Sequence, residues 1–433
     1  MKSLATAAGP RRRTDRAGLS LPAGFEVPWG AWFGDRTRRF GLPGGFEVEV
    51  LRIRGGTPLD GAEVGRRLEA PVGSPLLREL ARGRRDAVVA VEDLSRPARL
   101  SELLPAVLDE IHRGGIGPDR VRILIAVGAH APLDRTLLLK KLGSRILSRY
   151  EVMNHHPYED LVDLGRSSRG IPIHINRRFH EADLKIAVGS VVPHPYAGFG
   201  GGAKIVLPGV AGIETLEANH RPAVTGVKGA FNNVEENTAR AEMEEIAMKV
   251  GLEMIVNAVT DDRRRTVGVF AGHPVEAHRA AVAAARRIYG TPRPARPADV
   301  LVLNAYPKDT ELLQVGNVFN ALRGSPPMPV TPDGVVVVTA ACSLGRGFHS
   351  LHGPRMRLYR TPVVRQHLEG RTVIFHSPNL SAADARVSFW DGYPFERAWG
   401  GVVRRLTALC GPRARVAVFP CAPIQLLEDP PDA

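Results

Sequence analysis

The stretch DAVVAVEDLSRP, residues 86–97, begins with an apolar run rich in valine and ends with polar side chains. Such a run, bounded by a proline, predicts a strand that is buried on both faces. Asp93 and Arg96 then lie at the carboxyl end of that strand, which is the edge of an open α/β sheet where ligands bind. The stretch therefore predicts both a buried sheet and the position of a site.

Similar runs recur along the chain and alternate with helical patterns. We predict strands at FEVEVLRI (46–53), DAVVAVED (86–93), RVRILIAVG (120–128), DLKIAVGSVV (183–192), DVLVLNAY (299–306), GVVVVTAA (334–341), TVIFHS (372–377) and RVAVFP (415–420). We predict helices at 101–113, 237–250 and 274–289. This alternation predicts an α/β fold with mainly parallel sheets.

The length of 433 residues is enough for two domains, and the composition, 44% hydrophobic and 24% charged, is that of a globular protein. TPRPARPAD, residues 291–299, is the most linker-like interior segment. We therefore expect an N-terminal domain over 21–290 and a C-terminal α/β domain over 291–433, with the active site in the cleft between them. We expect residues 1–20 to be a disordered tail, and the segment after Leu427 likewise.

The charge and the cysteines narrow the class of protein. The net charge of +13 suits anionic substrates or a phosphorylated cofactor. Nucleic-acid binding is not expected, because aromatic residues make up only 6% of the chain and no run of basic residues is interleaved with them. Cys342, Cys410 and Cys421 are widely spaced and odd in number, so they suggest neither a disulfide scaffold nor a metal pair. With no signal-like or membrane-spanning run, a reducing cytoplasm is the expected location.

A second informative stretch, VVPHPYAGFGGGAKIVLPGVAGIETLEANH, covers residues 191–220. Its glycines allow positive φ and a close approach of backbone to a ligand. Lys204 follows them, and it can act as a point charge for phosphate or, when desolvated, as an amine that forms a covalent bond. A phosphate loop would place a hydroxyl residue after this lysine, whereas Ile205 stands there, which disfavours a phosphotransferase.

The order of several motifs resembles the nickel-dependent lactate racemase family, LarA and its homologues. The matching elements are DLSRP (93–97), GAH (128–130), PH (193–194), GFGGGAK (198–204), LPG (207–209), NH (219–220) and NAYPKDTELLQ (304–314). The resemblance implies a racemase or epimerase of a 2-hydroxy acid, with residues 21–290 as the catalytic and cofactor-binding domain.

The resemblance also implies a cofactor, the nickel-pincer nucleotide. This is a pyridinium-3-thioamide-5-thiocarboxylic acid mononucleotide that carries Ni(II), and cofactor biosynthesis proteins supply it. Lys204 would hold it covalently through a thioamide and His220 would be the protein ligand of nickel, to which imidazole is suited. The remaining residues expected to bind the cofactor are Asp93, Phe199, Gly201 and Gly202.

In such a family the C2 hydrogen moves as a hydride to the cofactor, while His130 and His194 alternate as base and acid. Histidine suits this role because its ordinary pKa of about 6.5 lies near neutral pH. Arg96 would pair with an anionic group of the substrate, since guanidinium matches carboxylate in two hydrogen bonds. Gln314 and Asn317 complete the expected substrate site.

Three positions depart from the family pattern. Asn317 stands where lactate racemases have a lysine near the substrate carboxylate, Ala131 replaces a usual arginine, and Gly200 replaces a usual serine. These changes favour a 2-hydroxy acid other than lactate. A protein that only binds a phosphorylated nucleotide-like ligand is the alternative, although it would not need both proton-carrying histidines.

Overall fold

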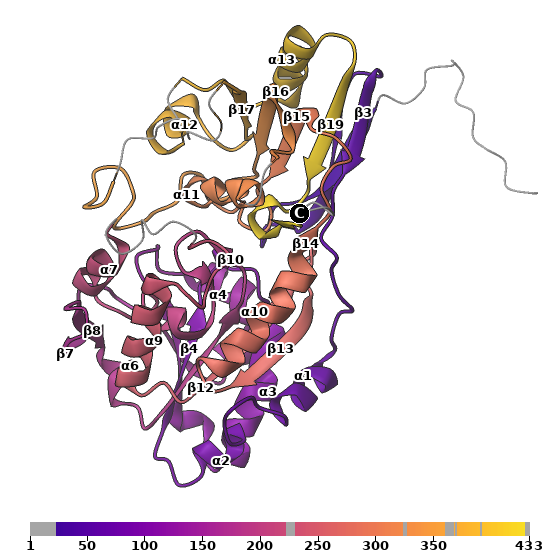
Figure 1. The fold of residues 1–433 in the computed structure, drawn as a ribbon. Helices are drawn as coiled ribbons and strands as arrows, with labels where there is room; N and C mark the ends of the chain where they lie inside the picture. The colour runs from indigo at the N-terminus through magenta and orange to yellow at the C-terminus, as the bar shows by residue number, and fades with distance from the viewer. Residues whose placement is uncertain are drawn as a thin grey trace, which may run out of the picture.

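Two six-stranded sheets dominate the computed structural model, which describes residues 23–221, 230–323, 327–359, 368, 370–389 and 392–428 (Figure 1). The expected tail over residues 1–20 lies outside the described residues, as does all but the first residue after Leu427. No helix in the described part of the chain is long and apolar enough to cross a membrane.

The first sheet has the strand order β13-β12-β9-β4-β5-β6. Its strands are β4 Ala87–Glu92, β5 Val121–Ala126, β6 Glu151–Asn154, β9 Leu184–Ser190, β12 Met254–Thr260 and β13 Thr266–Gly272. All neighbouring strands are parallel except β12 and β13. Every residue of β4 is buried, as expected for a parallel strand between layers of helices.

Helices cover both faces of this sheet. Buried residues of α3 Leu100–Arg113 and α10 Glu276–Tyr289 belong to one hydrophobic cluster, and those of α6 Arg177–Glu181, α7 Ile213–His220 and α9 Thr238–Val250 belong to another. In α3 the buried residues Leu100, Leu103, Leu104 and Val107 follow the spacing of one helix face. The helices predicted at 101–113, 237–250 and 274–289 are confirmed.

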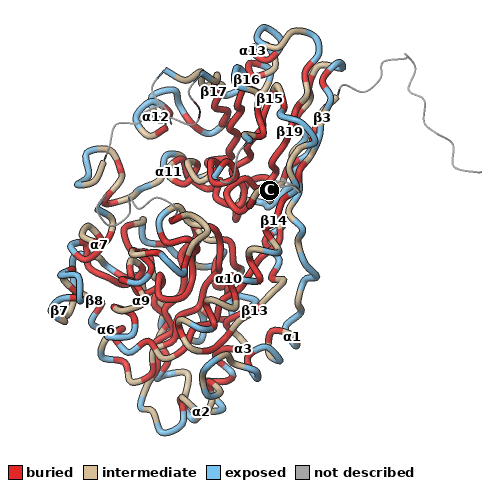
Figure 2. Tube along the Cα trace, in the orientation of Figure 1, coloured by how far each residue is buried: buried red, intermediate tan, exposed pale blue. Residues whose placement is uncertain are grey.

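The second sheet has the order β18-β17-β16-β15-β19-β3 and is parallel throughout. Its strands are β3 Phe46–Val50, β15 Ala298–Asn304, β16 Val330–Thr339, β17 Thr372–His376, β18 Phe395–Glu396 and β19 Ala414–Phe419. The strands of both sheets are largely buried, as the red segments of Figure 2 show. Each predicted strand therefore coincides with an observed one, and the α/β class is confirmed.

Antiparallel pairs were not predicted from the sequence. They include β1 Gly24–Trp29 with β2 Arg36–Gly41, and β7 Leu161–Arg166 with β8 Pro172–Asn176. The β1-β2 hairpin contributes aromatic side chains to the core of the second sheet, which β3 also joins. The division of the chain near 291–299 stays a prediction, and residues before it complete the second sheet.

The other helices are mostly short. They are α1 Gly61–Leu68, α2 Leu77–Ala81, α4 Arg135–Leu142, α5 Ser144–Leu147, α11 Leu312–Val315, α12 Ala382–Ser388 and α13 Trp399–Cys410. A 3-10 helix at Gly316–Leu322 continues from α11. These two elements follow β15 and bring part of the C-terminal half of the chain to the candidate site.

Candidate active site

A cavity of about 570 Å³ lies where residues after β4, β5 and β9 meet residues of α11 and the following 3-10 helix. Because β9, β4 and β5 are parallel neighbours, their carboxyl ends deliver these residues to one edge of the sheet. The volume is typical of a small-molecule site. Among the predicted site residues, the lining contains Asp93, Arg96, His130, His194, Gly201, Lys204, His220, Gln314 and Asn317.

Asp93 and His130 form a coupled pair at this edge. One carboxylate oxygen of Asp93 contacts Nδ1 of His130, and the other accepts hydrogen bonds from the N–H and the hydroxyl of Ser95 at 3.0 and 2.6 Å. Burial would raise the pKa of Asp93, but His130, the charge of Arg96 and the Ser95 hydrogen bonds lower it below its ordinary value. The ionised carboxylate therefore holds a proton on Nδ1 of His130 and leaves Nε2 able to accept one.

Two neighbouring glycines of the glycine-rich loop, residues 198–204, have positive φ shortly before Lys204. Gly201 has φ of 72° and Gly202 has φ of 58°. The N–H of Gly202 donates to the side-chain oxygen of Asn257 at 3.0 Å. A 3-10 helix, Gly202–Ile205, follows directly and carries Lys204 into the cavity lining.

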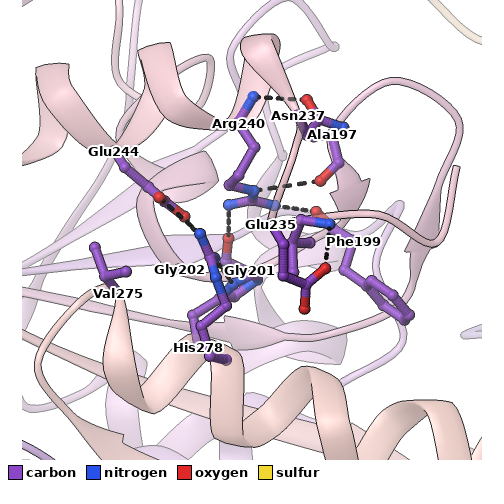
Figure 3. Close-up of polar contacts among 12 residues, drawn as sticks. Ala197, Phe199, Gly201, Gly202, Glu235, Asn237, Arg240, Glu244, Val275 and His278 are labelled. Carbon is purple, nitrogen blue, oxygen red and sulfur yellow. Dashed lines mark hydrogen bonds and ion pairs between the residues drawn. The ribbon is translucent and has the colours of Figure 1, made fainter. Parts of the chain in front are cut away.

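Arg240 of α9 holds this loop through hydrogen bonds to its backbone (Figure 3). Its buried guanidinium donates to the carbonyl oxygens of Ala197, Phe199 and Gly201. His278 of α10 contacts the Gly200 carbonyl oxygen at 2.9 Å. The loop backbone is therefore fixed by side chains from two helices, which is the local reason that Lys204 has a defined position.

Burial and nearby cations lower the pKa of two cavity groups, Lys204 and His194. Burial, followed by the charges of Arg96 and Arg240, holds the pKa of Lys204 well below its usual range. Burial and the charge of Lys204 likewise hold the pKa of His194 well below its usual range. Nδ1 of His194 accepts from two backbone N–H groups, so the ring proton lies on Nε2. A neutral lysine amine is the form that acts as a nucleophile.

His220 has the arrangement of a histidine that can bind a metal. Its Nδ1 donates to the Leu216 carbonyl oxygen at 2.9 Å, and the lone pair of Nε2 is therefore free. Histidines that bind metals usually donate the N–H of the other ring nitrogen in this way, for example to a backbone carbonyl. Burial lowers the pKa of His220 to about 3, so the imidazole is neutral. No group of three or more His, Cys, Asp or Glu in the described residues forms a metal site.

Two predicted cofactor residues are not part of the cavity lining formed by the described residues. Phe199 is fully buried in the hydrophobic core beside the first sheet, and Gly202 lies against the ring of His278. The stacking of Phe199 on a cofactor ring stays a prediction. The structure places its backbone carbonyl, by contrast, in the group of oxygens that Arg240 holds.

Sequence reasoning missed several residues at the cavity. His349 and His352 line it, and the ring of His349 lies 5.2 Å from that of His130 and 4.9 Å from that of His352, measured between centroids. Their H-x-x-H spacing was a signal that could have been noticed. Arg323 also lines the cavity, and Lys308 lies directly behind its wall, in contact with Asn317.

Comparison with known proteins gives consistent matches. The family model described as the lactate racemase N-terminal domain matches residues 33–231. The lactate racemase of Lactiplantibacillus plantarum is 30% identical over 298 residues, which cover 66% of this chain and 68% of that protein. The lactate racemase of Thermoanaerobacterium thermosaccharolyticum is 31% identical over 336 residues, which cover 75% of this chain and 76% of that protein.

Solved structures agree in fold. The lactate racemase apoprotein from Thermoanaerobacterium thermosaccharolyticum superposes with a TM-score of 0.71 at 24% identity, covering 94% of this chain and all of the other. A protein from Thermotoga maritima superposes with a TM-score of 0.63 at 16% identity, covering 86% of this chain and 100% of that one. These two likenesses support the two-sheet architecture described above.

Proposed function

Because this chain belongs to the lactate racemase family, we propose that it inverts the C2 centre of a 2-hydroxy acid with a nickel-pincer nucleotide bound in the cavity. One observation carries the proposal. His130 follows β5, whereas His194, Lys204 and His220 lie within residues 191–220, and all four line the same cavity. Such a set provides two proton-carrying groups, a nucleophilic amine and a metal ligand in one place.

Lys204 and His220 are the residues proposed to hold the cofactor. The amine of Lys204, whose pKa is lowered by burial, would form the thioamide, and the free Nε2 of His220 would bind nickel. When bound, this group supplies an acceptor that takes the C2 hydrogen as a hydride and returns it. Asp93, Gly201 and Gly202 are proposed to lie along the nucleotide.

His130 and His194 are the proposed acid-base groups. His130 accepts the hydroxyl proton of the substrate on Nε2, and the Asp93 carboxylate stabilises the imidazolium that results. His194, whose ring proton lies on Nε2, would be the partner of the substrate hydroxyl on the opposite face. Inversion needs both groups because the two faces of a planar 2-oxo acid are reached from opposite sides.

Arg96 is proposed to bind the substrate carboxylate, together with Gln314 and Asn317. Its guanidinium lines the cavity and makes no hydrogen bond or ion pair with another described residue, so it is free to pair with an anion. The substrate is proposed to differ from lactate because Asn317 replaces the lysine expected there. A cytoplasmic location is proposed, and the three cysteines, all in the described part of the chain, are free thiols.

Mass analysis of protein produced together with pincer-cofactor biosynthesis proteins and nickel tests this function. We expect a cofactor adduct on the peptide that contains Lys204, and its loss in Lys204→Ala but not in the control Lys140→Ala. An adduct would justify screening 2-hydroxy acids for inversion without ATP. Unmodified, nickel-free protein under conditions that load a known racemase would favour the non-racemising binding protein instead.

Variants of the histidines separate the two tasks. His130→Ala and His194→Ala should keep the adduct on Lys204 and lose inversion, because each removes a group that carries a proton. His220→Ala should lose nickel, measured by metal analysis, while the adduct mass of the organic part remains. Full turnover in either proton-carrying variant would contradict the two-base mechanism.

A further inference from the structure

Lys308 is a buried lysine whose amino group makes no ion pair with a carboxylate among the described residues. Its side chain is 1% exposed, and its Nζ lies 3.4 Å from the side-chain oxygen of Asn317. Burying a charged amine without a partner is costly, and proteins usually pair or neutralise such groups. A cation left in this state suggests that its partner is a ligand.

Lys141 provides an internal comparison, because it is equally buried but fully satisfied. Its Nζ lies 2.9 Å from a carboxylate oxygen of Glu92 and also donates to two backbone carbonyl oxygens. That geometry is what a structural lysine has in this fold. Lys308 has neither the carboxylate nor the carbonyls, so a purely structural role does not account for it.

The backbone holds Lys308 firmly in place. It follows β15, and its N–H donates to the Ala305 carbonyl oxygen at 2.8 Å. The next residue, Asp309, accepts from the N–H groups of Gly30 and Ala31 at 2.8 and 3.0 Å. The turn is therefore tied to the N-terminal hairpin, and the ammonium position is set by the fold rather than by a solvated side chain.

Two amide side chains connect Lys308 to the proposed reaction centre. Asn317, which contacts the ammonium, donates to the Gln314 carbonyl oxygen at 2.8 Å. The amide nitrogen of Gln314 lies 3.5 Å from Nε2 of His130. Both amides line the cavity, so Lys308 is behind the part of the wall that is next to the proposed base.

The charged groups around Lys308 favour an anionic ligand at this part of the cavity wall. Burial, Arg96 and Lys204 lower the pKa of Lys308 well below its usual range, and the carboxylates of Asp93 and Glu92 oppose this only in part. Asp93 is engaged with His130, and Glu92 with Lys141. An anion bound in the cavity would favour the charged form of Lys308, because a nearby opposite charge raises the pKa of a buried amine.

We propose that Lys308, acting with Asn317, forms the subsite for the substrate carboxylate beside His130. This inference rests on the proposed function and adds a specificity-determining residue to it. Arg96 would bind the same carboxylate from the cavity side, while the buried ammonium supplies the charge that Asn317 lacks. The subsite would select a 2-hydroxy acid anion over a neutral analogue of the same shape.

The test compares glycolate with glycolamide by titration calorimetry. Glycolate is the smallest 2-hydroxy acid anion, has no stereocentre to invert, and differs from glycolamide mainly in charge. Lys308→Met should weaken glycolate binding about tenfold or more, because it removes a positive charge from behind Asn317, and leave glycolamide binding unchanged. Lys140→Met, which removes a lysine outside the cavity, should affect neither ligand.

A second variant keeps the test decisive if Lys308→Met does not fold. Asn317→Asp is nearly isosteric and places a carboxylate against the ammonium, so it should abolish glycolate binding while the unfolding temperature holds or rises. Lys308→Arg should retain most glycolate affinity. Equal weakening of both ligands, or unchanged glycolate binding in Lys308→Met and Asn317→Asp, would overturn the subsite.

The same samples separate this inference from the proposed function. The Lys204 adduct is measured by mass in each variant, and calorimetry is run on protein with and without it. An adduct together with charge-independent glycolate binding overturns the subsite alone. Absence of the adduct in every sample overturns the proposed cofactor, while the glycolate and glycolamide comparison still decides the role of Lys308.

Discussion

Asp93 contacts Nδ1 of His130 although the two residues are 37 positions apart and follow different strands. β4 and β5 are parallel neighbours with Glu92 opposite Ala126, so the residues after them emerge side by side. The pairing gives His130 a fixed tautomer with Nε2 available in the cavity. It also explains why two motifs that are distant in the sequence work as one unit.

Asp93→Asn should lower kcat about 100-fold or more in the cofactor-loaded enzyme, because the amide neither holds the Nδ1 proton nor stabilises the imidazolium. The adduct on Lys204 should remain. Steady-state inversion rates over a range of pH measure the effect. Ser95→Ala, which removes one hydrogen bond to the same carboxylate, should reduce kcat far less; equal rates in Asp93→Asn and the parent would refute the pairing.

Replacing neighbouring glycines of the loop by alanine should change the free energy of unfolding by different amounts. At Gly201, where φ is 72°, a Cβ would lie 2.3 Å from the side-chain oxygen of Asn257. At Gly200 the nearest atom to a Cβ would be 3.4 Å away. We expect Gly201→Ala to cost about 1–3 kcal/mol of unfolding free energy and Gly200→Ala less than about 0.5 kcal/mol. Denaturant titration checks both, and similar costs would show that the loop is not constrained as described.

Arg240→Met should destabilise the protein by about 3 kcal/mol or more. The change removes a charged donor from three carbonyl oxygens of the loop, although those of Ala197 and Gly201 keep a backbone donor, and a hydrogen bond to a charged group contributes about 1.5–3 kcal/mol. The exposed Arg404→Met is the matched control and should change the unfolding free energy by less than about 0.5 kcal/mol. We also expect slower adduct formation on Lys204 in Arg240→Met, followed by mass; wild-type stability and loading would argue against the clamp.

His155 should make the fold sensitive to acid. Burial lowers its pKa to about 4, against 6.5 in the unfolded chain, and its hydrogen bond to the Ala211 carbonyl opposes this in part. Below about pH 6.5 the unfolded state binds more protons, so this contribution to stability is complete above that pH and is lost as pH falls toward 4.

From pH 7 to pH 5 the expected loss from this residue is about 2 kcal/mol. Unfolding free energies at the two pH values measure it, and the loss between pH 7 and pH 5 should be smaller by about 2 kcal/mol in His155→Gln than in the parent. His156→Gln, a change at the exposed neighbour, should leave it intact. An unchanged pH dependence in His155→Gln would exclude this residue as the cause.

The sequence by itself determined the class of fold and most of the candidate site residues. The local composition of valine-rich runs such as β4 predicts a strand that is buried on both faces. The spacing of apolar residues in α3 predicts which face of that helix is buried. The ordered motifs identified His130, His194, Lys204 and His220. These signals are local, so neither the hairpin β1-β2 nor the contribution of β3 to the second sheet could be obtained from them.

The tertiary structure alone decided which of these residues meet. The side chain of Phe199, expected at the cofactor, is in the core. Arg240, which lies in none of the quoted motifs, holds the loop, and Lys308, to which the matching stretch 304–314 gave no role, lies behind the cavity wall. A residue's partners across 37 or 184 positions depend on strand order and on how the two sheets bring their following loops together. The periodicity of apolar residues indicates which side of a helix or strand is buried. It does not indicate which residue of another element packs against that side.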